Sequence, residues 1–427
     1  MSPPGICAAT GQMILNRALL VICDGMGDRT HREFGDETPL GIAGTPAFDQ
    51  LASTGSVGLM DPVSPGIRPG SDYATTALLG YDPRVCYVGR GGLEAAGAGM
   101  ELKPGDVAFR CNFSTVDADS TVVDRRAGRI ERGTVEIARA VRAIRPKGIK
   151  DLRIDFQATV AHRGVLVLKG RGLSRMVSDV DPHATGVRFL KCEPLDDSTA
   201  AKRTAAAVND FVLQSAKILK NHPVNAERIR EGKPPANIIL PRGAGTLPPF
   251  KPLHDLYGMK VACVAAVALV KGVCRIAGAE VITPEGATGG LDTNYGGKAR
   301  AALEALRDHD LVILHVKAPD VASHDGDFRK KASVIEKIDD AVGKILPSLD
   351  MTSTYVAVTA DHSTPVNVKD HSGDPVPLLI NGPGVLRSNV SKFSENAVSR
   401  GNLGRLHGLD LMPMIADYLD KAKKFGF

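Results

Sequence analysis

Three short apolar runs, each followed by acidic or histidine side chains, constrain the fold of this chain more than any other feature. The run Leu311–Val316 is predicted to lead into a loop with Asp320 and His324, and similar runs near the two ends of the chain lead to Asp24 and to Asp361. Short continuous apolar runs are typical of buried parallel strands. Because the carboxyl ends of parallel strands meet at one edge of a sheet, we expect an α/β fold whose ligands gather at that edge.

The length of 427 residues is more than one ordinary hydrophobic core accommodates, so we expect two domains. A glycine-rich stretch begins at Gly89; because it precedes no clear helix, it does not predict a dinucleotide site. The proline-rich segment T-L-P-P-F-K-P is typical of a linker. The strand and helix pattern resumes after this segment. The sequence therefore predicts a discontinuous catalytic domain, residues 1–88 and 251–427, and an inserted α/β domain at residues 89–250.

Composition argues against several classes of protein. The net charge of +5 comes from interspersed acidic and basic residues, which favours a solvated surface over a nucleic-acid interface. The most apolar run, Val261–Val270, is too short to span a membrane. The seven cysteines include no C-x-x-C pair and are interpreted as buried thiols of a reducing compartment. Because the segment up to Asn16 lacks the features of a signal peptide, we expect a cytoplasmic protein without nucleic-acid or membrane partners. Its oligomeric state stays open.

Ser71 lies where a helix is predicted to begin. Proline and glycine make the segment up to Gly70 irregular, and the pattern from Asp72 to Leu79 is helical. The unpaired N–H groups and the dipole at a helix N-terminus favour an anion. An ordinary N-cap is the commoner role of such a serine. The alternative is a nucleophile that carries a phosphoryl group.

Acidic, imidazole and hydroxyl side chains together form one candidate constellation. Its members are Asp24, Ser71, Asp320, His324, Asp361, His362 and His371. The set is too large for one closed tetrahedral zinc site and is sufficient for two divalent ions with open positions. Each pair alone could belong to an ordinary surface loop, but their recurrence at strand ends favours an active site. Mixed carboxylate and imidazole ligation favours Mn or Zn, with Co or Mg as alternatives.

Basic side chains form a second group of candidates, most of them in the predicted insert. This group consists of Arg125, Arg126, His162, Arg163, Arg242 and Lys271. Clustered arginines are usually solvated, but in loops that follow strands they also bind carboxylate or phosphate groups in bidentate fashion. We expect them to bind an anionic substrate.

These motifs resemble those of a known family. The strings D-G-M-G-D-R, P-G-S-D, D-V-A-S-H-D-G, T-A-D-H-S-T-P and D-H-S-G-D-P-V-P resemble the metal motifs of the alkaline phosphatase superfamily. More narrowly, they resemble the archaeal-type, cofactor-independent (2,3-bisphosphoglycerate-independent) phosphoglycerate mutases. The resemblance extends through the insert, where it includes V-V-D-R-R-A-G-R and P-A-N-I-I-L-P-R-G-A-G. It implies an alkaline-phosphatase-like, three-layer doubly wound sheet with an inserted second α/β domain.

The resemblance also implies roles for the first group of residues. One metal ion would be held by Asp320, His324 and His371. The other would be held by Asp24, Ser71, Asp361 and His362. Ser71 would attack the phosphate of 3-phosphoglycerate, become phosphoserine and return the phosphoryl group to the 2-oxygen. This isomerisation, a step of glycolysis and gluconeogenesis, would need two divalent ions but neither a nucleotide nor 2,3-bisphosphoglycerate.

The insert would retain the glycerate and exclude water by closing as a substrate-binding lid. The partner is thus expected to be a small phosphorylated three-carbon acid, held by the basic group. His162 would move protons between the two hydroxyls, with Asp181 and His183 as competitors for that role.

Other functions compete with this interpretation. The same metal core would suit a metal-dependent phosphatase or phosphodiesterase, which would release phosphate from many esters. A phosphotransferase would require a nucleotide, and the sequence contains no G-x-x-x-x-G-K-[ST] loop. A binding protein without activity would not need the complete ligand set.

Overall fold

The computed structural model describes residues 15–424 and 426 and divides into two compact units. Unit 1 comprises Met1–Cys86 and Phe250–Phe427, and unit 2 comprises Tyr87–Pro249. The segment before Asn16, which lacks the features of a signal peptide, lies almost entirely outside the described residues. Within residues 15–424, no helix combines the length and the apolar character that crossing a bilayer requires.

An eight-stranded sheet forms the centre of unit 1, with the order β13-β2-β12-β11-β1-β10-β8-β9. The strands are β1 (Arg17–Cys23), β2 (Ser56–Asp61), β8 (Val261–Val264), β9 (Glu280–Ile282), β10 (Leu311–Val316), β11 (Thr354–Thr359), β12 (Val376–Asn381) and β13 (Gly404–His407). Strand β1 is parallel to its neighbours β10 and β11. These strands consist almost entirely of buried residues, as expected for strands covered on both faces.

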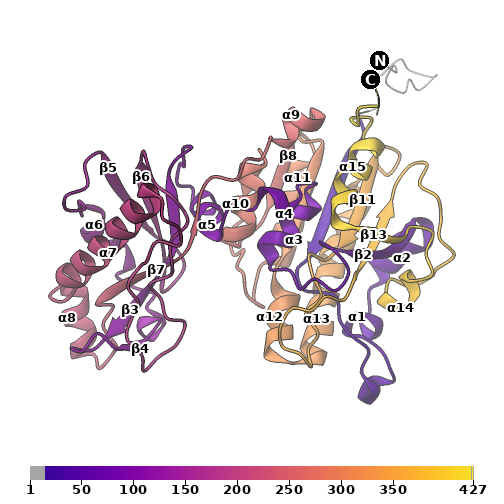
Figure 1. The fold of residues 1–427 in the computed structure, drawn as a ribbon. Coiled ribbons are helices and arrows are strands. Elements are labelled where there is room, and N and C mark those ends of the chain that lie inside the picture. Colours follow the sequence, from indigo (N-terminus) through magenta and orange to yellow (C-terminus); the bar gives the residue numbers. More distant parts are fainter. Residues whose placement is uncertain (1–14, 425, 427) are drawn as a thin grey trace. The chain divides into compact units, whose positions relative to one another are not determined.

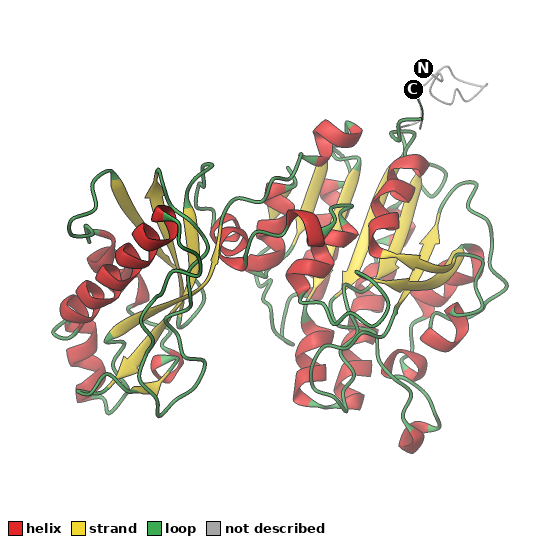
Figure 2. Cartoon of the chain, viewed as in Figure 1, coloured by secondary structure: helices red, strands yellow, loops and turns green. Residues whose placement is uncertain are grey.

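Helices cover both faces of this sheet (Figures 1 and 2). They are α1 (Pro39–Ile42), α2 (Pro46–Thr54), α3 (Ser71–Leu78), α4 (Pro83–Cys86), α9 (Leu253–Tyr257), α10 (Ala268–Ile276), α11 (Tyr295–Ala305), α12 (Ala318–Asp325), α13 (Phe328–Gly343), α14 (Glu395–Val398) and α15 (Gly408–Tyr418). Helix α3 packs on α10 and α15, whereas α13 packs on α1, α2, α11 and α12. The layered arrangement confirms the predicted α/β fold.

Unit 2 contains a five-stranded antiparallel sheet. Its strands are β3 (Val107–Val116), β4 (Val122–Asp124), β5 (Leu152–Ala158), β6 (Arg163–Gly170) and β7 (Ile238–Gly245). Its helices are α5 (Arg90–Gly97), α6 (Thr134–Arg142), α7 (Thr199–Leu219) and α8 (Pro223–Arg230). The rings of Phe113, Phe156 and Phe211 pack in its core.

Two local predictions are wrong. The Gly-rich stretch that begins at Gly89 leads directly into helix α5, although the sequence analysis expects no clear helix there. Asp320 and His324 lie in helix α12 rather than in a loop. Pro319 occupies the first turn of α12, and Gly326 ends it in the left-handed conformation, with φ of 75°. Positions i and i+4 then place both side chains on one face of the helix.

Candidate metal centre

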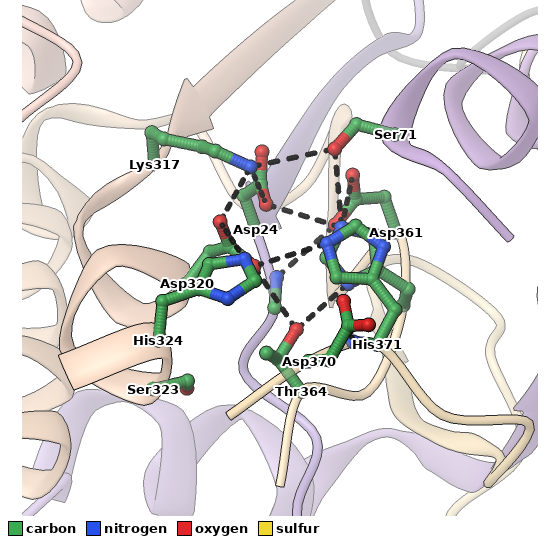
Figure 3. Close-up of polar contacts among 12 residues, drawn as sticks. Asp24, Ser71, Lys317, Asp320, Ser323, His324, Asp361, Thr364, Asp370 and His371 are labelled. Atoms are coloured by element: carbon green, nitrogen blue, oxygen red, sulfur yellow. Dashed lines mark hydrogen bonds and ion pairs between the residues drawn. The ribbon is translucent and has the colours of Figure 1, made fainter. Parts of the chain in front are cut away.

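The candidate metal ligands meet at the carboxyl ends of β1, β10 and β11 (Figure 3). Asp24 directly follows β1, and Asp361 and His362 follow β11 after one residue, Ala360. Asp24, Asp361 and His362 are fully buried, and Asp320 is 2% exposed. The fold thus gathers several carboxylates and imidazoles away from water, which is costly unless cations compensate the charge.

One group of ligand atoms comes from Asp320, His324 and His371, and these atoms all lie within 4.8 Å of one another. Asp320 Oδ2 lies 3.4 Å from His324 Nε2, and Asp320 Oδ1 lies 3.5 Å from His371 Nε2. Burial raises the pKa of Asp320, but the contact with His371 and the charge of Lys317 hold that pKa well below its usual value. Asp320 is therefore a carboxylate at neutral pH.

A second group surrounds Asp24. Its carboxylate, with Asp320 and His362, supplies atoms within 4.8 Å of one another, and it does the same with His315 and Asp361. His362 Nε2 lies 3.4 Å from both Asp24 Oδ1 and Asp361 Oδ2. The two groups share Asp320, so they form one continuous centre.

The imidazole hydrogen bonds show which nitrogens are available as ligands. His324 Nδ1 donates to the carbonyl of Lys369 at 2.8 Å, and His371 Nδ1 donates to the carbonyl of Pro69 at 2.7 Å. His362 Nδ1 lies 2.9 Å from Thr364 Oγ1, whose proton goes to Asp320. Because each Nδ1 carries a proton, each Nε2 keeps its lone pair in the neutral ring, the usual state of a metal-ligating histidine.

The surroundings of Asp361 also show whether divalent ions fit this centre. Its Oδ2 is buried and accepts no hydrogen bond from the described residues. Burial, and then the charge of Asp24, raise the pKa of Asp361. A nearby cation would satisfy the orphaned oxygen and stabilise its charge. Oxygen and nitrogen donors with these properties fit two divalent ions.

Ser71 is the first residue of α3, and Gly70 rather than Ser71 is the N-cap. The Ser71 hydroxyl lies 3.1 Å from His362 Nε2. The structure therefore places the predicted nucleophile beside the ligand cluster, at a helix N-terminus whose dipole favours an anion.

Two residues of this centre are absent from the sequence-based set. Lys317 Nζ lies 2.8 Å from Asp24 Oδ1, 2.7 Å from Asp320 Oδ2 and 3.4 Å from Ser71 Oγ. His315 Nε2 lies 2.9 Å from Asp24 Oδ2. Burial raises the pKa of Asp24, but the Lys317 ammonium and the His315 hydrogen bond hold it well below its usual value. The sequence feature that could have identified His315 is a histidine inside an otherwise apolar strand.

The basic candidates of unit 2 line one cavity of about 330 Å³. Its lining consists of Arg110, Asn112, Arg125, Arg126, His162, Arg163, His183 and Arg242. Arg110 and Asn112 are additions to the sequence-based set. They alternate along β3, a period-two signal that the sequence carries. Lys271 is not among the residues that line this cavity. It lies on α10 of unit 1, where burial and then Arg275 lower its pKa.

The three candidates for proton transfer differ in their surroundings. Burial, and then the charges of Arg163 and Arg126, lower the pKa of His162 to about 4. The Nδ1 of His162 accepts or donates no hydrogen bond among the described residues. By contrast, Asp181 is bound by Arg125 through two contacts of 2.8 Å, and His183 Nε2 lies 3.0 Å from Asp179 Oδ2. The surroundings of His162 thus favour its neutral form and leave its Nδ1 without a partner among the described residues.

Comparison with known proteins identifies the family. A family model described as 2,3-bisphosphoglycerate-independent phosphoglycerate mutase matches residues 52–225. The proteins of that name from Methanosphaera stadtmanae and Methanopyrus kandleri are 47% and 49% identical to this chain, over 96% of it and over 100% and 99% of their own lengths.

Solved structures agree with these relatives. A protein from Pyrococcus horikoshii matches with a TM-score of 0.84 and 38% identity, over 97% of this chain and 100% of its own. The cofactor-independent phosphoglycerate mutase from Thermoplasma acidophilum matches with a TM-score of 0.72 and 34% identity, over 95% of this chain and 100% of its own. These comparisons confirm the resemblance inferred from the motifs. The chain belongs to the 2,3-bisphosphoglycerate-independent phosphoglycerate mutases, which are isomerases.

Proposed function

We propose that this chain interconverts 3-phosphoglycerate and 2-phosphoglycerate through a phosphoserine at Ser71. The observation that carries the proposal is the position of the Ser71 hydroxyl, 3.1 Å from His362 Nε2 and 3.4 Å from Lys317 Nζ. A hydroxyl at a helix N-terminus, next to a cation and a ligand cluster, is suited to receive a phosphoryl group.

Asp320, His324 and His371 would hold one divalent ion, and Asp24, Ser71, Asp361 and His362 would hold the other. When bound, such ions lower the pKa of a serine hydroxyl and neutralise the charge of the transferring phosphoryl group. We favour Mn or Zn, with Co or Mg as alternatives, because the ligands combine carboxylates and imidazoles.

The chain's own residues account for the transfer itself. Ser71 Oγ forms a bond to phosphorus while the bond between phosphorus and the 3-oxygen of glycerate breaks, and the 3-oxygen gains a proton in place of the one that Ser71 loses. In the second step the bond between Ser71 Oγ and phosphorus breaks while the 2-oxygen of glycerate forms a bond to phosphorus. Ser71 then regains a proton in place of the one that the 2-hydroxyl loses. Lys317 lies within reach of the phosphoserine and stabilises its charge, and the N–H groups at the start of α3 favour the same anion.

The basic cavity of unit 2 distinguishes a mutase from a phosphatase. Its arginines bind the carboxylate and hydroxyls of glycerate, so the alcohol is retained between the two steps. His162, whose pKa is lowered to about 4, is neutral at physiological pH and can carry a proton between the two hydroxyls. Unit 2 would act as the lid that excludes water during transfer.

We also propose that the enzyme works in the cytoplasm. The six cysteines in the described part of the chain are all buried free thiols, which is typical of a reducing compartment.

The test is a coupled assay of 3-phosphoglycerate conversion without 2,3-bisphosphoglycerate, run beside an assay of phosphate release. A mutase should form 2-phosphoglycerate with little free phosphate. Rapid phosphate release without 2-phosphoglycerate would instead support a metal-dependent phosphatase or phosphodiesterase, the competing function of the same centre.

A further inference from the structure

A buried ion pair, Asp28–Lys331, contacts the loops that carry the proposed metal ligands but belongs to none of the ligand groups. Both side chains are fully shielded from solvent. The ammonium of Lys331, on α13, donates to Asp28 Oδ2 at 2.9 Å and to the carbonyls of Gly27 and Thr364 at 3.0 Å each. A lysine ammonium has three N–H donors, so these three acceptors satisfy it completely.

The two carbonyls belong to the two loops that carry the ligands around Ser71. Gly27 follows Asp24 in the loop after β1, and Thr364 follows His362 in the loop after β11. The loops also bond to each other, because the N–H of Thr364 donates to the carbonyl of Gly27 at 3.0 Å. Lys331 is therefore a common anchor for both loops.

Thr364 connects this anchor to the ligands. Its Oγ1 lies 2.9 Å from His362 Nδ1 and donates to Asp320 Oδ1 at 3.0 Å (Figure 3). A displacement of Thr364 would therefore disturb one ligand of each proposed ion. It would also remove the acceptor that keeps the proton on Nδ1 of His362 and leaves Nε2 free.

Asp28 anchors the same loops through its carboxylate. Its Oδ2 accepts from the N–H of Val366 at 3.2 Å, and its Oδ1 lies 3.1 Å from His31 Nε2. The N–H of Asp28 donates to Glu395 Oε1 at 3.1 Å. The ion pair thus joins the loop after β1, the loop after β11, α13 and α14.

We propose that the Asp28–Lys331 pair positions the two ligand loops, so that the metal centre is formed before the ions bind. Stability alone does not require the pair, because apolar side chains of similar volume often replace a buried ion pair without loss. Directional hydrogen bonds to two loop carbonyls, in contrast, fix where the ligands lie. Lys331 is a positioning residue in this inference, which rests on the ligand set proposed above.

The test uses the double variant Asp28→Leu/Lys331→Met of the full-length chain, which removes both charges and leaves neither unpaired. Cooperative thermal unfolding of the metal-free protein shows whether it folds. Calorimetric titration with Mn²⁺ then measures the metal affinity, which should fall about 10- to 100-fold. The kcat for 3-phosphoglycerate should fall as well, while KM should change less than about threefold, since the substrate-binding cavity is untouched.

The matched control is Asp340→Leu/Lys344→Met, which makes the same substitutions at an exposed pair formed by Asp340 of the same helix and its C-cap residue Lys344, with a contact of 2.6 Å. It should bind Mn²⁺ as the unchanged protein does. Equal Mn²⁺ affinity in a folded Asp28→Leu/Lys331→Met protein would overturn the positioning role alone. Failure of the unchanged protein to bind Mn²⁺ would instead overturn the proposed ligand set.

If the double variant does not fold, hydrogen exchange of the unchanged protein tests the positioning role of the Asp28–Lys331 pair. In the unchanged, metal-free protein the amides of Thr364 and Val366 should already be protected, because the loops are held without ions. Complete exchange of these amides before Mn²⁺ is added, followed by protection afterwards, would show that the ions rather than the ion pair order the loops.

Discussion

Asp181→Asn should destabilise unit 2, because Asp181 is a buried anion that binds side chains lining the basic cavity. Its carboxylate accepts two hydrogen bonds from Arg125 at 2.8 Å, one from Asn112 Nδ2 at 3.1 Å and one from the N–H of His183 at 3.0 Å. Asparagine keeps one acceptor oxygen but presents an NH₂ donor to the remaining donors. The substitution therefore removes hydrogen bonds and leaves the arginines without their counter-ion.

The size of the effect follows from these contacts. Removing one partner of a buried ion pair costs about 3–5 kcal/mol. The side chain of Arg125 is 21% exposed, so water recovers part of that loss, and we expect the free energy of unfolding of unit 2 to fall by about 3 kcal/mol. For a unit of about 160 residues this corresponds to a decrease in Tm of roughly 6–12 °C.

Urea titration followed by hydrogen exchange of the β3 and β6 amides would measure this loss within unit 2 of the full-length chain. The control is Asp82→Asn, which breaks a two-contact pair with Arg84, of 3.0 and 3.2 Å, at the surface of unit 1. The control should leave stability essentially unchanged, because solvated ion pairs contribute little. A loss at Asp181 no greater than that of the control would refute the reasoning.

The pH dependence of the difference is a further check. Burial raises the pKa of Asp181, but the hydrogen bonds from Arg125 and from the His183 N–H outweigh it and hold the pKa below its usual value. The pKa of an aspartate in an unfolded chain is about 3.9. The stabilisation is therefore complete above that pH and is lost as the pH falls through the lower folded pKa. The stability difference between the two proteins should be constant from neutral pH down to roughly pH 5 and shrink at strongly acidic pH.

Three further predictions concern the centre and the packing of unit 2. Ser71→Ala should reduce conversion of 3-phosphoglycerate more than about 10³-fold in the coupled assay while Mn²⁺ binding falls only partly, and turnover like that of the unchanged protein would exclude Ser71 as nucleophile. Chelation should abolish turnover and added Mn²⁺ or Zn²⁺ should restore it; activity in protein shown to be metal-free by elemental analysis would contradict the two-ion centre. Gly91→Ala should destabilise unit 2 by about 1–3 kcal/mol, because a Cβ at Gly91 would overlap the carbonyl oxygen of Ala108; unchanged urea unfolding would show that the backbone adapts.

The sequence was sufficient for the strands that organise the centre. Leu311–Val316 and the runs before Asp24 and Asp361 are buried on both faces, so each is apolar throughout and leaves a clear local signal. The ligands at their ends could be found for the same reason. Helix α12 could also have been predicted from Pro319 at its start and Gly326 at its end, but an acidic residue and a histidine after a strand suggested a loop.

The residues around the ligands are less accessible to sequence reasoning, because their roles depend on long-range hydrogen bonds. Lys331 is an ordinary lysine on an amphipathic helix, yet its ammonium reaches carbonyls 304 and 33 positions away along the chain. Asp28 belongs to the motif D-G-M-G-D-R and gives no sign that it pairs with Lys331 rather than binding a metal. Only the folded chain brings these segments together.

The positions of His315 and Lys317 show how the sheet determines the chemistry of the centre. In the parallel pairing of β1 and β10, Cys23 lies opposite Val316, and the N–H of Asp24 donates to the carbonyl of Val316 at 2.9 Å. This register places Asp24 beside His315 and Lys317, which flank Val316 and point to the same face. A slip of one residue would turn both side chains to the opposite face and leave the Asp24 carboxylate without either partner. The apolar side chains that fix the register, far from any reacting atom, therefore also fix the charge around Asp24 and the cation next to Ser71.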